Sequence, residues 1–264
     1  MSGSGVGRAS LSQLYKEKVT ELIRLSNDGL SRLSPDAAHD LRVTTRRLQA
    51  MSKLAPDTGR TPKSLKFDAA LSKLLKATSP VRDADTLIRN LQPFKAHLPE
   101  QLSALLQTER EKAAAGARAS IGALAYSDPP SSLFHARKGP QKRYKRRVSK
   151  RGRSVGRLLG VVLNDESKVT ELHALRKEVR KLRYLLELTD EGSAELSTLT
   201  EWQDALGKVH DMDVTVAFTT DNLARFKGGE GVLEALKRKR HQAYLGFRRG
   251  CRKLDSESLS EILN

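Results

Sequence analysis

The feature that most constrains the fold of this chain is a helical pattern that occurs twice. Three pairs of short segments correspond in the same order: HDLRVTTRRLQ (39–49) with HALRKEVRKLR (173–183), YKEKV (15–19) with YKRRV (144–148), and VRDAD (81–85) with VHDMD (209–213). Farther along, Arg110 and Arg118 match Arg240 and Arg248. Self-similarity of this kind predicts two copies of one supersecondary unit, and we infer a pseudo-twofold relation between them.

The spacing of apolar residues predicts helices along almost the whole chain. Apolar residues recur at helical intervals over 11–29. Ser34-Pro35-Asp36 is typical of a helix start, and this helix is predicted to end near Leu54. Further helices are predicted over 64–78, 83–92, 99–124, 134–157, 168–189, 194–207, 211–224 and 230–254. No stretch shows the alternation expected of strands and hairpins. The expected fold is all-α, with each copy a bundle of four helices.

A change of composition marks the boundary between the two copies. The segment YSDPPSS at 126–132 has the proline and serine content of a linker. We therefore predict a flexible N-terminus (1–10), a first helical repeat (11–126), a second helical repeat (134–254) and a C-terminal tail (255–264).

The charge balance limits the possible partners. The chain has 264 residues and a net charge of +17, which favours nucleic acid, an anionic membrane or a phosphate-rich polymer. Cys251 is the only cysteine, so no intramolecular disulfide can form. No apolar run is long enough to predict a membrane span, and the first residues lack the apolar core of a signal peptide. We expect an intracellular protein.

The matched segments place cations in a stripe on each predicted helix. In the first copy, His39, Arg42 and Arg46 lie within about 60° of one another, with Arg47 beside them and the leucines opposite. The second copy has a corresponding stripe with these members: His173, Arg176, Lys177, Arg180 and Tyr184, flanked by Lys181 and Arg183. A cationic stripe is usually a solvated helix face. Its recurrence in both copies favours a binding surface, which could line a common groove or pore.

Two further charged features accompany these stripes. The segment 137–157 holds 11 Lys or Arg and no acid, and we interpret it as a basic helix rather than a disordered linker or a localisation signal. The acid pairs Asp83/Asp85 and Asp211/Asp213 are interpreted as caps near helix starts, in preference to a metal site. They could also hold nearby arginines in place.

The motifs HxLRxxxRRL, LHALRKEVRKLRYLLEL and LGKVHDMDV resemble those of the CHAD family, the conserved-histidine α-helical domains. The resemblance covers roughly 11–254 and includes the duplication. It implies two four-helix bundles around a pseudo-twofold axis with a basic central cavity. It also implies binding of inorganic polyphosphate through histidines, arginines and lysines. We expect this binding to be non-catalytic, without a cofactor or metal.

Carried over by position, the resemblance implies a set of polyphosphate-binding residues: His39, Arg42, Arg46, Arg47, Arg82, Arg143, Arg147, Lys150, His173, Arg176, Arg180, Lys181, Arg183, Tyr184, His210 and Arg248. The first copy departs from the pattern at Gln49 and Ala50, where the second has Arg183 and Tyr184. We therefore expect the two copies to contribute unequally.

Two other functions compete with polyphosphate binding. A surface this basic also binds nucleic acid non-specifically, but only 5% of the residues are aromatic, which gives few platforms for stacking bases. The dipeptides His39-Asp40 and His210-Asp211 resemble part of a metal-dependent phosphohydrolase site, yet neither is repeated in the other copy. We expect a cytoplasmic protein, associated with polyphosphate granules, or a nuclear or nucleolar one if the source is eukaryotic.

Overall fold

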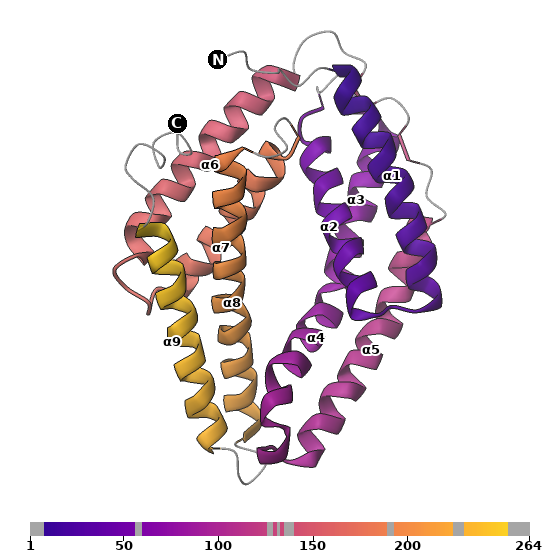
Figure 1. Ribbon diagram of the computed structural model, residues 1–264. Coiled ribbons are helices and arrows are strands. Elements are labelled where there is room, and N and C mark those ends of the chain that lie inside the picture. Colours follow the sequence, from indigo (N-terminus) through magenta and orange to yellow (C-terminus); the bar gives the residue numbers. More distant parts are fainter. Residues whose placement is uncertain are drawn as a thin grey trace. The chain divides into compact units, whose positions relative to one another are not determined.

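The structure is a computed structural model that describes residues 8–55, 60–125, 129–130, 133–134, 140–188, 193–223 and 230–252. All regular secondary structure in these ranges is helical, which confirms the predicted all-α class (Figure 1). The elements in chain order are α1 (Arg8–Ser31), α2 (Pro35–Ser52), α3 (Pro62–Ala77), α4 (Ser79–Leu91), η2 (Gln92–His97), α5 (Glu100–Ala125), α6 (Pro140–Val162), α7 (Val169–Leu186), α8 (Ala194–Leu223) and α9 (Glu230–Arg252).

The start of α2 follows the local signal in the sequence. The Ser34 side chain accepts a hydrogen bond from the Ala37 backbone N–H at 3.1 Å, and Pro35 occupies the first turn. This cap satisfies one of the backbone donors that a helix start leaves unpaired. The predicted helix start is therefore confirmed. Residues 8–10, which we expected to belong to a flexible end, are the first residues of α1.

One proline explains a difference between corresponding helices. Pro80 follows the junction of α3 and α4, and a proline there removes a backbone donor and clashes with the preceding turn. Lys208 stands at the matching place in VHDMD, and α8 runs through it without a break. The prediction of two helices over 194–207 and 211–224 is therefore wrong, because nothing between them interrupts the helix.

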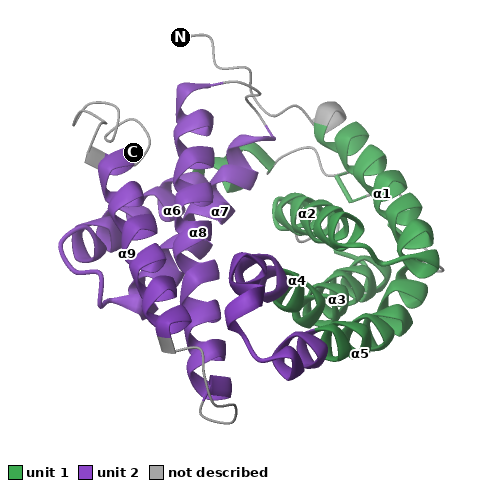
Figure 2. Cartoon of the chain, turned by 60° about the horizontal axis from the view of Figure 1, so that its bottom comes forward, with its two compact units in different colours: residues 1–85, 107–145 green, residues 86–106, 146–264 purple. Residues whose placement is uncertain are grey.

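Contacts divide the chain into two compact units, which Figure 2 shows in different colours. Unit 1 comprises residues 1–85 and 107–145, and unit 2 comprises residues 86–106 and 146–264. In unit 1, the buried side chains include Leu41 and Leu48, the leucines predicted to lie opposite the cationic stripe of α2. The duplication and the basic central cavity stay predictions.

The described residues of unit 2 include two apolar clusters. The larger cluster joins α6, α7, α8 and α9 around buried side chains such as Trp202 and Phe247. The smaller cluster packs Leu87, Leu91 and Leu106 against Leu236 of α9. The second half of α4 and the start of α5 therefore belong to the core of unit 2. No helix in the described ranges is both long and apolar enough to cross a membrane.

Candidate anion-binding site

Helix α7 separates an apolar face from a cationic one, as its sequence predicts. Leu175, Val179 and Leu182 are fully buried in the core of unit 2. His173 and Arg176 lie elsewhere on the helix and are partly exposed. Burial of the leucines and the valine fixes the rotation of the helix, because apolar side chains are stabilised by removal from water. The cations are thereby held at the surface.

His210 of α8 meets this cationic face. Its ring lies edge-on to that of His173, with centroids 4.5 Å apart. Burial, followed by the charge of Arg176, lowers the pKa of His210 to about 3, and Arg180 and Lys177 act in the same direction. The imidazole is therefore neutral at pH 7, and the surrounding positive charge is available to an anion.

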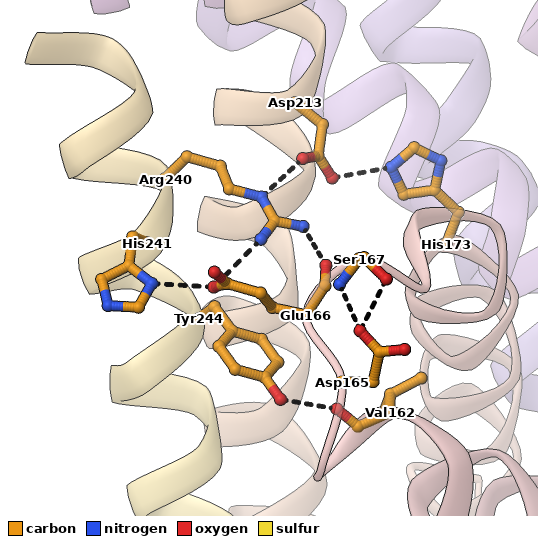
Figure 3. A network of polar contacts seen from close by, with 9 residues as sticks. All are labelled: Val162, Asp165, Glu166, Ser167, His173, Asp213, Arg240, His241 and Tyr244. Carbon is orange, nitrogen blue, oxygen red and sulfur yellow. Dashed lines mark hydrogen bonds and ion pairs between the residues drawn. The ribbon is translucent and has the colours of Figure 1, made fainter. Parts of the chain in front are cut away.

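His173 is held by a carboxylate from α8. Its Nε2 lies 3.0 Å from Oδ2 of Asp213, and Oδ1 of Asp213 accepts a hydrogen bond from Nε of Arg240 at 2.9 Å (Figure 3). Arg240 also donates to the backbone oxygen of Glu166 at 2.8 Å. Figure 3 shows how these contacts connect α7, α8, α9 and the loop before α7.

Hydrogen bonds and ion pairs hold the loop before α7 in place against α9. The Glu166 carboxylate lies 2.8 Å from Nδ1 of His241 and 3.3 Å from a guanidinium nitrogen of Arg240. Asp165 accepts hydrogen bonds from the backbone N–H and the hydroxyl of Ser167. The hydroxyl of Tyr244 donates to the last residue of α6, Val162. These contacts fix the position of the Glu166 backbone carbonyl, which accepts a hydrogen bond from Arg240.

Unit 1 has a looser counterpart of this cluster. His39 of α2 is exposed, and its pKa is lowered first by partial desolvation and then by the charge of Arg82 on α4, with Arg46 adding to the effect and Asp40 opposing it. Arg82 aligns with His210 and His39 with His173. The same two positions therefore interact within each unit: His39 with Arg82 in unit 1, and His173 with His210 in unit 2.

The acid that holds the arginine also recurs in unit 1. Oδ1 of Asp85 accepts from Nε of Arg110 at 2.9 Å, and Arg110 donates to the backbone oxygen of Leu33 at 2.6 Å. These contacts correspond to those of Asp213 and Arg240. Oδ2 of Asp85 is buried without a hydrogen bond, whereas Oδ2 of Asp213 contacts a histidine.

The family model for the CHAD domain matches residues 17–220. The chain belongs to the CHAD family. A solved structure of the CHAD domain from the plant Ricinus communis aligns with a TM-score of 0.64 at 17% identity, covering 96% of this chain and 94% of that one. PptA from Streptomyces chartreusis aligns with a TM-score of 0.62 at 16% identity, covering 93% and 99%. At these identities the likeness concerns the fold. A search of curated proteins found no significant match.

One cation of this CHAD chain faces inward where the helical stripe predicts an exposed side chain. Arg42 is 8% exposed, and its Nη1 donates to the backbone oxygen of Leu75 at 2.7 Å and to the hydroxyls of Thr78 and Ser79 at 3.0 Å each. The break at Pro80 places these acceptors beside α2. The guanidinium therefore ties α2 to the corner between α3 and α4.

The end of the α7 stripe is also buried. Arg183 is 9% exposed, donates to Gln203 at 2.9 Å and contacts Glu187. Its guanidinium lies over the ring of Tyr184, 4.4 Å from the centroid, and Tyr184 is itself buried. Lys181 stays exposed and forms an ion pair with Glu178 at 2.7 Å. The accessible part of the stripe therefore ends near Arg180.

Helix α6 confirms that most of the basic segment is helical, while residues 137–139 lie outside the described ranges. Three residues of α6 are predicted to bind: Arg143 and Arg147 are partly exposed, and Lys150 is exposed. Arg248 of α9 is also partly exposed, and its guanidinium lies 6.0 Å from the Tyr244 ring centroid. Arg47 is partly exposed on α2.

The structure adds one cationic surface, of which only Lys150 is among the residues that the resemblance implies. Arg146, Lys150, Arg153 and Arg157 are all exposed on α6 at intervals of four, three and four residues. Residues at these intervals share a helix face. We call these four residues the α6 stripe. The same spacing argument that found the stripes of α2 and α7 would have found it.

The acid pairs do not cap helices. Asp211 and Asp213 lie in the interior of α8, and Asp83 and Asp85 lie beyond the first turn of α4. The capping interpretation is therefore wrong, because α4 already begins at Ser79 and α8 runs through residue 208 without a new start. Three of these carboxylates contact arginines: Asp85 pairs with Arg110, Asp213 with Arg240, and Asp211 with Arg89 at 3.1 Å. Among the described residues, no group of three or more His, Cys, Asp or Glu side chains could hold a metal ion.

Proposed function

We propose that this CHAD protein binds inorganic polyphosphate, and that it does so without catalysing a reaction. The observation that carries the proposal is the cluster around His210, where Arg176, Lys177 and Arg180 act together on a neutral ring. Cations held this close repel one another, and a bound anion would relieve that repulsion. The cluster is partly exposed, so a polymer can reach it.

The chemistry of the cluster suits a chain of phosphates. Arginine pairs phosphate oxygens two at a time in a fixed plane, and lysine adds a compact charge. A neutral imidazole donates one further hydrogen bond. Polyphosphate offers dense negative charge and no bases, so it needs none of the aromatic platforms that single-stranded nucleic acid uses.

The proposed contact residues are the accessible members of the two clusters. In unit 2 they are His173, Arg176, Lys177, Arg180 and His210. In unit 1 they are His39, Arg46, Arg47 and Arg82. We leave out Arg42, Arg183 and Tyr184, because their side chains are buried and held by neighbouring residues.

The proposal is tested by titration calorimetry with long-chain polyphosphate at two salt concentrations, repeated with single-stranded DNA matched in charge. We expect saturable binding to polyphosphate and much weaker binding to DNA. Affinity for both should fall with salt, because bound polyanions release counterions. Equal and fully salt-labile binding to both polymers would overturn the proposal and favour non-specific nucleic-acid binding. Location in the cytoplasm or on granules stays a prediction.

A further inference from the structure

A single nitrogen of His173 makes two polar contacts. Its Nε2 lies 3.0 Å from Oδ2 of Asp213 and 3.1 Å from Nδ1 of His210. The other oxygen of Asp213 accepts from Arg240. An imidazole nitrogen carries either a hydrogen or a lone pair, so these two contacts cannot be assigned independently.

The carboxylate decides the assignment. Asp213 forms an ion pair with Arg240, and the carboxylate of such a pair has only acceptors. Nε2 of His173 must therefore carry a hydrogen, which is shared between Asp213 and His210. Nδ1 of His210 must then be unprotonated, because two donors cannot face each other at 3.1 Å. The remaining ring hydrogen of His210 is on Nε2.

We propose that Asp213 and Arg240 are positioning residues, which set the tautomers of His173 and His210 and so make the Nε2–H of His210 the donor offered to a bound phosphate. This inference rests on the proposed function for the identity of the anion, but the tautomers belong to the free protein. The pKa of His210, which burial and then the charge of Arg176 lower, agrees with a ring that carries a single hydrogen.

Arg240 is itself firmly held. It donates to the backbone oxygen of Glu166 at 2.8 Å, contacts the Glu166 carboxylate, and is largely buried, with 14% of its side chain exposed. It therefore has few donors left for a polymer. Its effect on the histidine tautomers passes through Asp213.

The corresponding arginine and acid of unit 1 provide a control. Asp85 and Arg110 form the same contact, but no hydrogen bond joins Asp85 Oδ2 to a histidine. A substitution of Asp85 should therefore disturb the local arginine contact without changing the tautomer of any histidine. Any general effect of removing such a carboxylate should appear whether Asp85 or Asp213 is replaced.

The first test needs no substitution. The full chain is labelled with ¹⁵N at histidine, and long-range ¹H–¹⁵N correlation spectra at pH 7 identify which ring nitrogens carry hydrogen. We expect Nε2 to be protonated in both His173 and His210, and Nδ1 of His210 to be unprotonated. A hydrogen on Nδ1 of His210 in the free protein would overturn the proposal.

The second test compares Asp213→Asn with Asp85→Asn. An asparagine at 213 has one acceptor for two donors, so its NH₂ group must face either Arg240 or His173. Because Arg240 has no lone pair, the NH₂ should turn to His173 and switch both rings to the opposite tautomer. Asp85→Asn should leave both tautomers unchanged. Unchanged tautomers in a folded Asp213→Asn variant, or the same switch in both variants, would contradict the proposal.

Binding provides a separate readout. Loss of one well-placed neutral donor should weaken polyphosphate binding by Asp213→Asn roughly 2- to 10-fold. If the tautomers switch and the affinity does not change, the phosphate-donor role of His210 is wrong. If wild-type protein shows the expected tautomers and binds no polyphosphate, the proposed function fails while the assignment of the tautomers stands.

Discussion

Helices α2 and α7 carry matched sequences, yet they use their matched arginines differently. Arg42 of α2 is buried and bonded to the corner between α3 and α4, whereas Arg176 of α7 is partly exposed beside His210. The corner exists because Pro80 interrupts the helix, and α8 has Lys208 in its place. A change in a neighbouring helix therefore converts a candidate ligand into a structural residue.

The histidines show the same contrast. His173 is fixed by Asp213 and by His210, while His39 is exposed and has Arg82 where unit 2 has its second histidine. Unit 2 therefore has the more ordered cluster, and the proposed function assigns it the larger share of binding. The unequal contribution of the two copies stays a prediction.

The largest expected effect, on the free energy of unfolding, comes from placing a proline in α8 at the position that matches Pro80 of α4. Lys208→Pro removes a backbone donor in the interior of α8 and should lower stability by about 3 kcal/mol or more. Lys208→Ala is the control, because Lys208 is exposed and alanine favours a helix. Thermal denaturation followed by circular dichroism measures the difference. Equal melting temperatures for the two variants would refute the role assigned to Pro80.

A smaller effect separates the matched arginines. Arg42→Leu removes the buried guanidinium that donates to the Leu75 carbonyl and to the hydroxyls of Thr78 and Ser79, and should cost about 2–3 kcal/mol. Arg176→Leu affects a partly exposed side chain and should cost clearly less. Urea denaturation of both variants compares the free energies of unfolding. A similar loss for both substitutions would mean that the two positions are equivalent after all.

The smallest effect concerns pH. The pKa of His210 is lowered to about 3 in the folded protein, so between pH 6.5 and 3 the unfolded chain binds a proton that the folded chain does not. This group therefore lowers stability as the pH falls through that window. His210→Asn should flatten the pH dependence of the melting temperature, and His39→Asn should flatten it less because its ring is exposed. The opposite ranking would contradict the contrast between the clusters.

The sequence predicts the features that depend on local spacing. The capped start of α2 and the buried leucines at 41 and 48 follow from it directly. The inward turn of Arg42 does not, because it depends on the Leu75 carbonyl and two hydroxyls at the corner where α3 ends. The contact between His173 and Asp213 joins residues 40 positions apart. Only the alignment of the two copies, with Asp85 and Asp213 in register, hinted at such a role.

The central claim is that polyphosphate binds at a specific cluster of side chains on α7 and α8, formed by the unit 2 contact residues proposed above. The alternative is that it binds anywhere on the protein through the net positive charge. The claim is tested by comparing Arg176→Glu/Arg180→Glu with Arg153→Glu/Arg157→Glu of the α6 stripe, which changes the net charge by the same amount. Calorimetric titration with long-chain polyphosphate at fixed salt measures both affinities. We predict at least a roughly tenfold loss, or about 1.4 kcal/mol, for the α7 pair and little change for the α6 pair. Equal losses would contradict the account, because binding would then follow total charge.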